Sequence, residues 1–151
     1  MADRERDGYV LTTDKDRVDV DRVHRWLSEE AYWALGRPRE VVEKSIHASW
    51  VWSVLGPDGA QVAFLRAVTD VLTFAWICDV FVDPAHRGRG LATWLSAEAV
   101  ADLTAAGVDR FVLATSSAHD VYRRVGFTIP PEGRYMHLDT RGTTLPTPAG
   151  P

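Results

Sequence analysis

The stretch VDPAHRGRGLATWL, from Val82 to Leu95, holds residue types that can bind an anion, because two glycines and two arginines precede a predicted helix. Backbone N–H groups at the start of a helix have no intrahelical acceptor, and glycine lets a ligand approach the backbone without a Cβ in the way. The helix dipole adds positive potential to that of Arg87 and Arg89. The stretch therefore favours a phosphate or pyrophosphate site, with a solvated basic loop as the alternative that short glycine motifs leave open.

Two common phosphate-binding motifs do not fit this stretch. The P-loop pattern Gly-x-x-x-x-Gly-Lys-Ser/Thr is absent, and Gly88-x-Gly90 lacks the third glycine of the dinucleotide fingerprint. A second segment that could do chemistry is AHDVYRRVGF, Ala118–Phe127. Its Tyr122 carries a phenol, which can donate a proton and has an ordinary pKa near 10.

Together the two segments resemble the GCN5-related N-acetyltransferases, the GNAT superfamily. RGRGLA at 87–92 is similar to the acyl-CoA motif Q/R-x-x-G-x-G/A of that family, and residues 118–127 are similar to its later segment A-x-x-x-Y-x-x-x-G-F. The resemblance extends over about Tyr9 to Leu138 and is specific over Asp79–Phe127. It implies an α/β fold with a mixed, twisted sheet flanked by helices on both faces. The sheet is expected to splay between its central parallel strands, where the pantetheine arm enters.

The resemblance also implies acetyl-CoA as the cofactor and assigns roles by position. The amides of Arg87–Ala92 would hold the pyrophosphate, the backbone of Val82 would pair with pantetheine as an added strand, and Tyr122 would reprotonate the CoA thiolate. A core tyrosine is the alternative for Tyr122. The expected cofactor-binding residues are Val80, Phe81, Val82, Arg87, Gly88, Arg89, Gly90, Leu91, Ala92, Thr115, Ala118 and Tyr122.

Several residues are candidates for the general base of such a transfer. Asp79 is the first candidate, because it interrupts an otherwise apolar strand and burial would raise its pKa. Its alternative role is to accept hydrogen bonds at the splay. His119 is the second catalytic candidate, with a half-exposed helix histidine as its alternative, and nothing singles out His24 or His47. The five histidines show no metal-ligand spacing, so no metal site is expected.

The first third of the chain is the expected acceptor side. Trp26, Glu30 and Trp33, together with Asp79, are predicted to bind the acceptor, because aromatic walls and carboxylates suit a cationic small-molecule amine. The alternative is that the tryptophans are core residues and the glutamates form a solvated face. Thr115 stands where many members of the family have asparagine, and the Thr115–Ser117 stretch lacks an expected aspartate. That departure keeps open a GNAT-fold acyl-CoA-binding or regulatory module with little catalysis.

Hydrophobic patterning predicts the elements that position these residues. Helices are expected at Asp19–Leu27, Arg39–Ala48, Leu91–Ala106 and 116–125. Strands are expected at 9–13, 49–56, 60–69, 71–82, 108–115, 127–129 and 134–139, the second and third forming a hairpin around Pro57-Asp58-Gly59. Residues 9–139 are expected to form one domain, with flexible termini at 1–8 and 140–151.

Composition narrows the function further. The 151 residues are 46% hydrophobic and 25% charged with a net charge of −4, which argues against a nucleic-acid binder. The longest apolar run is interrupted by Asp79, so no membrane span is expected, and the charged N-terminus does not resemble a secretory signal. Cytoplasm is therefore the expected location. Cys78 is the sole cysteine and lies in an apolar run, so transfer without a covalent acyl-enzyme is expected. The resemblance also implies one possible assembly, a homodimer that pairs through the last strands.

Overall fold

The computed structural model describes residues 2–141, and these form a mixed α/β fold around one sheet. The strands are β1 (Arg4–Arg6), β2 (Tyr9–Thr12), β3 (Trp50–Leu55), β4 (Gln61–Thr69), β5 (Ala75–Val82) and β6 (Phe111–Val112). The helices are α1 (Val20–Arg25), α2 (Arg39–His47), α3 (Leu91–Ala106) and α4 (His119–Val125). Short turns of helix are η1 (Lys15–Arg17), η2 (Trp26–Glu30, a π-helical turn that continues α1) and η3 (Pro84–His86). Within the described residues, no helix is both long and apolar enough to span a bilayer.

The sheet runs in the order β1-β2-β3-β4-β5-β6, and each neighbouring pair is antiparallel except β5 and β6. The parallel pair is joined through α3, which forms the predicted βαβ unit. Its pairing covers only Ala75 opposite Phe111 and Trp76 opposite Val112. Beyond Trp76 the two strands are no longer paired, so the mixed sheet with a splay between its central parallel strands is confirmed.

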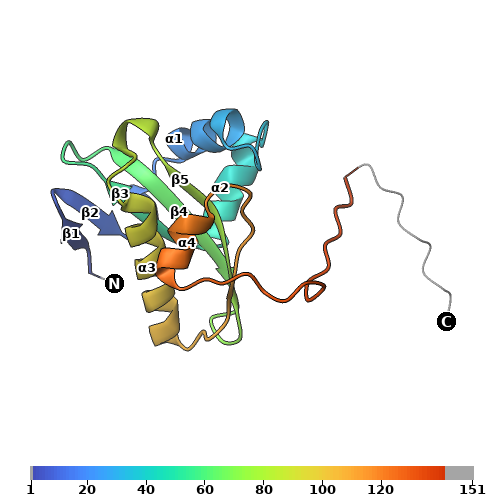
Figure 1. Ribbon diagram of the computed structural model, residues 1–151. Coiled ribbons are helices and arrows are strands. Elements are labelled where there is room, and N and C mark those ends of the chain that lie inside the picture. The colour runs from blue at the N-terminus through green and yellow to red at the C-terminus, as the bar shows by residue number, and fades with distance from the viewer. Residues whose placement is uncertain (1, 142–151) are drawn as a thin grey trace.

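Helices cover both faces of the sheet (Figure 1). One face packs against α3, whose predicted stripe Leu91, Leu95, Ala99 and Leu103 is buried. The other face packs Val51, Phe64 and Phe81 against α1, η2 and α2. The bounds of α3 agree with the prediction, because glycines in the left-handed conformation, at φ 70° and φ 116°, flank the helix at Gly90 and Gly107.

A β-bulge at Asp79 decides which face each side chain of β5 joins. Phe81 lies opposite Phe64 and Cys78 lies opposite Arg66, so two residues of β5 occupy the place of a single residue of β4. Asp79 has a φ of 52°, in the left-handed region that aspartate tolerates better than most residues. Before the bulge Ile77 packs on the α3 side, and after it Phe81 packs on the opposite side. The bulge therefore reverses the alternation of the strand.

Both ends of the chain differ from expectation. The prediction of a flexible segment at 1–8 is wrong for Arg4–Arg6, which form β1. Arg4 donates to Asp102 of α3 and pairs with Glu98 at 3.3 Å. The strands predicted at 127–129 and 134–139 are absent from the described residues, and this part of the chain extends away from the body (Figure 1). Most of residues 128–141 are exposed, so no neighbouring edge pairs with them there. The rest of the predicted tail, 142–151, lies outside the described residues.

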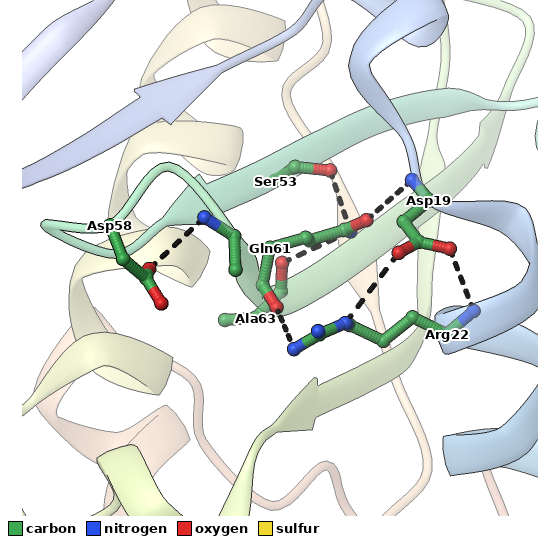
Figure 2. A network of polar contacts seen from close by, with 7 residues as sticks. Asp19, Arg22, Ser53, Asp58, Gln61 and Ala63 are labelled. Atoms are coloured by element: carbon green, nitrogen blue, oxygen red, sulfur yellow. Dashed lines mark hydrogen bonds and ion pairs between the residues drawn. The ribbon is translucent and has the colours of Figure 1, made fainter.

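A buried polar network ties the start of α1 to the β3–β4 hairpin (Figure 2). The side chain of Gln61 accepts from the N–H of Asp19 at 2.7 Å and donates to Ser53 Oγ at 3.0 Å. Asp19 caps α1 by accepting from the N–H of Arg22 at 2.9 Å, and the Arg22 guanidinium donates to the Gln61 carbonyl at 3.1 Å. Gln61 is 3% exposed, so its amide satisfies groups that water does not reach.

Candidate functional site

The loop before α3 presents a row of unpaired backbone donors. Trp94 N–H is the first of the helix to find its acceptor, the Gly90 carbonyl at 3.0 Å, and the N–H groups of residues 88–93 have no acceptor within the described chain. Gly88 and Gly90 have φ values of 75° and 70°, and a Cβ at Gly88 would meet no atom within 4 Å. Free amides, the N-terminal end of a 16-residue helix and open space fit an anionic group.

Three guanidinium groups surround this loop. Arg87 and Arg89 are exposed, and Arg87 Nε donates to the Val82 carbonyl at 3.1 Å while its guanidinium lies 5.4 Å from the centre of the Phe81 ring. Arg6 comes from β1: its Nη2 donates to the Arg89 carbonyl at 3.2 Å. Arg6 was not predicted from the sequence, because its place depends on β1, which lies in the segment expected to be flexible. The loop is thus more positive than its own residues suggest.

A pocket of about 350 Å³ opens where β5 and β6 diverge. It receives side chains from the segment before α2, from β4 and β5, and from the segment that leads into α4. The lining residues are Tyr32, Trp33, Arg37, Arg66, Val68, Trp76, Ile77, Cys78, Asp79, Val80, Ala114, Thr115, Ser117, Ala118 and Tyr122. A second hollow of about 1180 Å³ adjoins this pocket between β6 and the extended segment after α4, and the two share Trp33, Trp76 and Ala114.

Tyr122 of α4 lies at the wall of this pocket with 9% of its surface exposed. Burial raises the pKa of Tyr122 to about 12, and the nearby Tyr32 adds to the shift. Its hydroxyl has no hydrogen-bond partner among residues 2–141, and its ring packs edge-on against Phe127 at 5.9 Å. The phenol therefore keeps its proton at neutral pH. Burial likewise raises the pKa of the Cys78 thiol to about 11, which leaves it protonated.

Asp79 accepts from three side chains, two from the segment before α2 and one from β4. Trp33 Nε1 donates to Oδ1 at 3.0 Å, and Arg37 Nη1 and Arg66 Nε each donate to Oδ2 at 2.6 Å. Burial raises the pKa of Asp79, but the charges and hydrogen bonds of Arg66 and Arg37 outweigh it and hold the pKa below its usual value. The expectation of a raised pKa is therefore wrong. The structure shows the alternative role, in which the carboxylate accepts hydrogen bonds at the splay.

Arg66 is the residue of this network that the sequence analysis missed. It stands in the apolar strand β4 opposite Cys78, the residue that precedes the other charged interruption, Asp79, in the neighbouring strand β5. Charged residues of opposite sign in two adjacent apolar strands are a signal that could have found the pair. Arg66 Nη1 also donates to Ser49 Oγ at 3.2 Å, which fixes its guanidinium plane.

The segment leading into α4 is held by hydroxyl groups. Thr115 Oγ1 accepts from the N–H of Ala118 at 3.0 Å and of Ser117 at 3.4 Å, and so shapes the turn before the helix. Across the pocket mouth, Tyr32 Oη accepts from the N–H of Ser116 at 3.1 Å. That hydrogen bond lowers the pKa of Tyr32 from its usual value. Tyr32 thereby connects the predicted acceptor side to the segment that precedes Tyr122.

Several predicted site residues lie elsewhere. Trp26 belongs to the core, where it stacks on Phe81 at 5.3 Å, and Glu30 is exposed and does not line the pocket. The side chain of Phe81 therefore faces away from the splay. His119 is half-buried at the first position of α4 and also does not line the pocket. Trp33, Val80, Asp79, Thr115, Ala118 and Tyr122 are brought together as expected, while residues 87–92 lie outside this pocket, in the loop before α3 and at the start of that helix.

The chain is similar in sequence to known proteins. The rice protein serotonin N-acetyltransferase 2, chloroplastic (Oryza sativa subsp. japonica) is 33% identical over 133 residues, which cover 83% of this chain and 64% of the rice protein. The chain thus spans less than two thirds of that relative. GCN5-related N-acetyltransferase 1, chloroplastic, of Arabidopsis thaliana is 27% identical over 137 residues, covering 87% of this chain and 67% of that protein. Because both plant proteins are named chloroplastic, the cytoplasmic location stays a prediction.

Solved structures and a family model agree with the sequence relatives. A crystal structure of a GNAT-family protein from Xanthomonas campestris pv. campestris matches with a TM-score of 0.81 at 39% identity, covering 89% of this chain and 94% of that chain. A structure from Deinococcus radiodurans R1, at 19% identity and a TM-score of 0.71 over 94% of this chain and 95% of that one, shares the fold. The family model described as Acetyltransferase (GNAT) family matches residues 20–127. The chain belongs to the GNAT acetyltransferase family.

Proposed function

We propose that the protein is an N-acetyltransferase that moves an acetyl group from acetyl-CoA directly to the amine of a small molecule in a ternary complex. The observation that carries the proposal is the pairing of two sites in a GNAT fold: the unpaired amides before α3 and the pocket that contains Tyr122. The name of the rice relative, a serotonin N-acetyltransferase, supports an amine as acceptor.

The residues present fit acetyl-CoA. The free amides of residues 88–92, flanked by Arg87 and Arg89, suit its pyrophosphate, and the edge of β5 from Val80 to Val82 that β6 leaves unpaired suits an extended pantetheine arm. Ala118 and Thr115 line the pocket beside that edge. When bound, acetyl-CoA supplies the acetyl group as an activated thioester.

The side chains of the pocket set the route of the protons. Because the pKa of Tyr122 is raised to about 12, its Oη stays protonated and is the donor for the leaving sulfur. The acceptor amine has to lose a proton, and Asp79 is poorly suited to take it because three donors already occupy its oxygens. We assign the proton to solvent, which reaches the open pocket. Cys78 stays a protonated thiol with a pKa of about 11, which agrees with direct transfer and not with an acyl-enzyme.

Release of free CoA thiol tests this function. Acetyl-CoA is incubated with pools of small amines and with wild type, Tyr122→Phe or the control Tyr135→Phe, whose ring is exposed and lies outside the pocket. We expect wild type and Tyr135→Phe to release thiol with at least one pool, and Tyr122→Phe to be slower by about 100-fold with CoA affinity retained. Tight CoA binding without release in any pool would instead show the acyl-CoA-binding module.

A further inference from the structure

The pocket carries an excess of positive charge. Its charged lining consists of two guanidinium groups, those of Arg37 and Arg66, against a single carboxylate, that of Asp79. Their side chains are 21%, 15% and 2% exposed, so water screens the charges only in part. Glu30 lies outside the pocket, so it does not balance them. The pocket is therefore unsuited to a ligand whose only charge is an ammonium group.

Asp79 cannot serve as the partner of a cationic ligand without losing its present contacts. Its Oδ1 is taken by Trp33, and its Oδ2 is shared by Arg37 and Arg66. An approaching ammonium group would compete with two guanidinium groups for the same oxygen and would also be repelled by them. The charge that this site accepts more readily is negative.

Arg37 offers the free donors for such a charge. Arg66 uses both Nε and Nη1, whereas Arg37 uses Nη1 alone, so its Nε and Nη2 have no acceptor within residues 2–141. That edge of a guanidinium matches the two oxygens of a carboxylate. The backbone holds Arg37 in place, since its N–H donates to Ala34 O at 3.0 Å and its carbonyl contacts His24 Nε2 at 3.2 Å. The side chain itself is held by the donation of Nη1 to Asp79 Oδ2 at 2.6 Å, which leaves the Nε and Nη2 edge free for a ligand.

The remaining walls are flat and apolar. Trp33, Trp76 and Val68 line the pocket with 41%, 39% and 44% of their surfaces exposed, and Tyr32 closes one side. We propose that the acceptor is an amine that also carries a carboxylate, with an aromatic or apolar body, and that Arg37 binds this carboxylate while the body packs on Trp33 and Trp76. The proposal rests on the N-acetyl transfer proposed above and names its substrate class.

Binding measured without turnover tests this class separately from acetyl transfer. Tryptophan fluorescence, in the presence of saturating CoA, is titrated with L-phenylalanine and with phenethylamine, which differ by the carboxylate. We expect L-phenylalanine to bind at least about tenfold more tightly, as one charge-assisted hydrogen bond or more would give. Arg37→Gln should remove this preference by weakening L-phenylalanine binding, whereas phenethylamine should bind at least as tightly as it does to wild type, because one repelling charge is gone. Retained phenethylamine binding would also show that the pocket is folded. Arg25→Gln, an exposed arginine outside the pocket, is the matched control and should keep the preference.

The opposite results are equally clear. Equal affinities, tighter binding of phenethylamine, no detectable binding of L-phenylalanine, or a preference that survives Arg37→Gln would each overturn the assignment. Because none of these readings needs the acetyl group, the thiol-release assay with amine pools can still succeed when this proposal fails. Conversely, a selective pocket in a protein that releases no thiol would leave the carboxylate assignment standing and overturn the transfer.

Discussion

Replacing Asp79 with asparagine is expected to destabilise the fold by about 2–3 kcal/mol. Asparagine has nearly the same size and tolerates the φ of 52° at this position, so backbone strain stays constant. What is lost is the charge that Arg37 and Arg66 share. Removing one partner of a buried ion pair costs about 3–5 kcal/mol. The loss expected here lies at or below the lower end of that range, because the two arginine side chains are 21% and 15% exposed.

The effect should depend on pH with a defined sign. The folded protein holds the pKa of Asp79 below its ordinary value, so the carboxylate stabilises the fold fully at any pH above that ordinary value. The contribution is lost as the pH falls through the lower, folded pKa. The difference between wild type and Asp79→Asn is therefore expected to be constant from pH 6 to 8 and to shrink in acid.

Urea denaturation followed by tryptophan fluorescence measures the change. We expect a lower midpoint with an unchanged m-value, and a smaller loss, by about 1 kcal/mol or more, when Asp79→Asn is made in an Arg66→Met background. The control Asp58→Asn changes an exposed hairpin residue and should cost less than about 0.5 kcal/mol. A loss below about 0.5 kcal/mol for Asp79→Asn, or one that the Arg66 change does not alter, would refute the network as the reason for the buried carboxylate.

Four further changes test other parts of the structure. Gly90→Glu should weaken CoA binding more than about tenfold in calorimetry because it places a like charge at the anion site, whereas Gly59→Glu, in an open turn with a φ of 80°, should not. Turnover should not fall between pH 7 and 10, since the pKa of Tyr122 is raised to about 12; a descending limb near pH 9 would argue against its role. Arg4→Met should lower Tm by about 3–6 °C through loss of its ion pairs to α3. An unchanged Tm would instead support the prediction of a flexible N-terminal segment. Gln61→Leu should cost about 2–3 kcal/mol in urea unfolding, because it leaves buried donors and acceptors unpaired.

Local signals in the sequence were sufficient for the elements that frame the site. The bounds of α3 follow from Gly90, Gly107 and a stripe repeated every four residues, all of which are local in the chain. The two motifs placed the glycine-rich loop directly before α3 and Tyr122 on a helix, as the structure has them. The hairpin of β3 and β4 followed from the Pro-Asp-Gly turn between two apolar runs.

Features that depend on distant contacts could not be read in the same way. Trp26 and Trp33 stand seven residues apart in one aromatic segment, yet the π-helical turn over Trp26–Glu30 changes the phase of the chain. As a result the first joins the core and the second reaches Asp79. Arg66 and Arg6 acquire their places through strand pairing. The residues at 134–139 have a strand-like composition, but a strand also needs a neighbouring edge, which composition does not reveal.

The bulge in β5 has a consequence for changes in chain length. Deleting Asp79 would remove the extra residue and restore a regular alternation through the strand. Phe81 would then turn toward α3, and Val82 would turn toward α1 and α2, which exchanges the partners of both hydrophobic clusters. The number of residues in this strand, and not only their types, therefore decides which face each side chain joins. Insertions and deletions between Ile77 and Phe81 are therefore expected to be far less tolerated than substitutions, in this chain and in any library built from it.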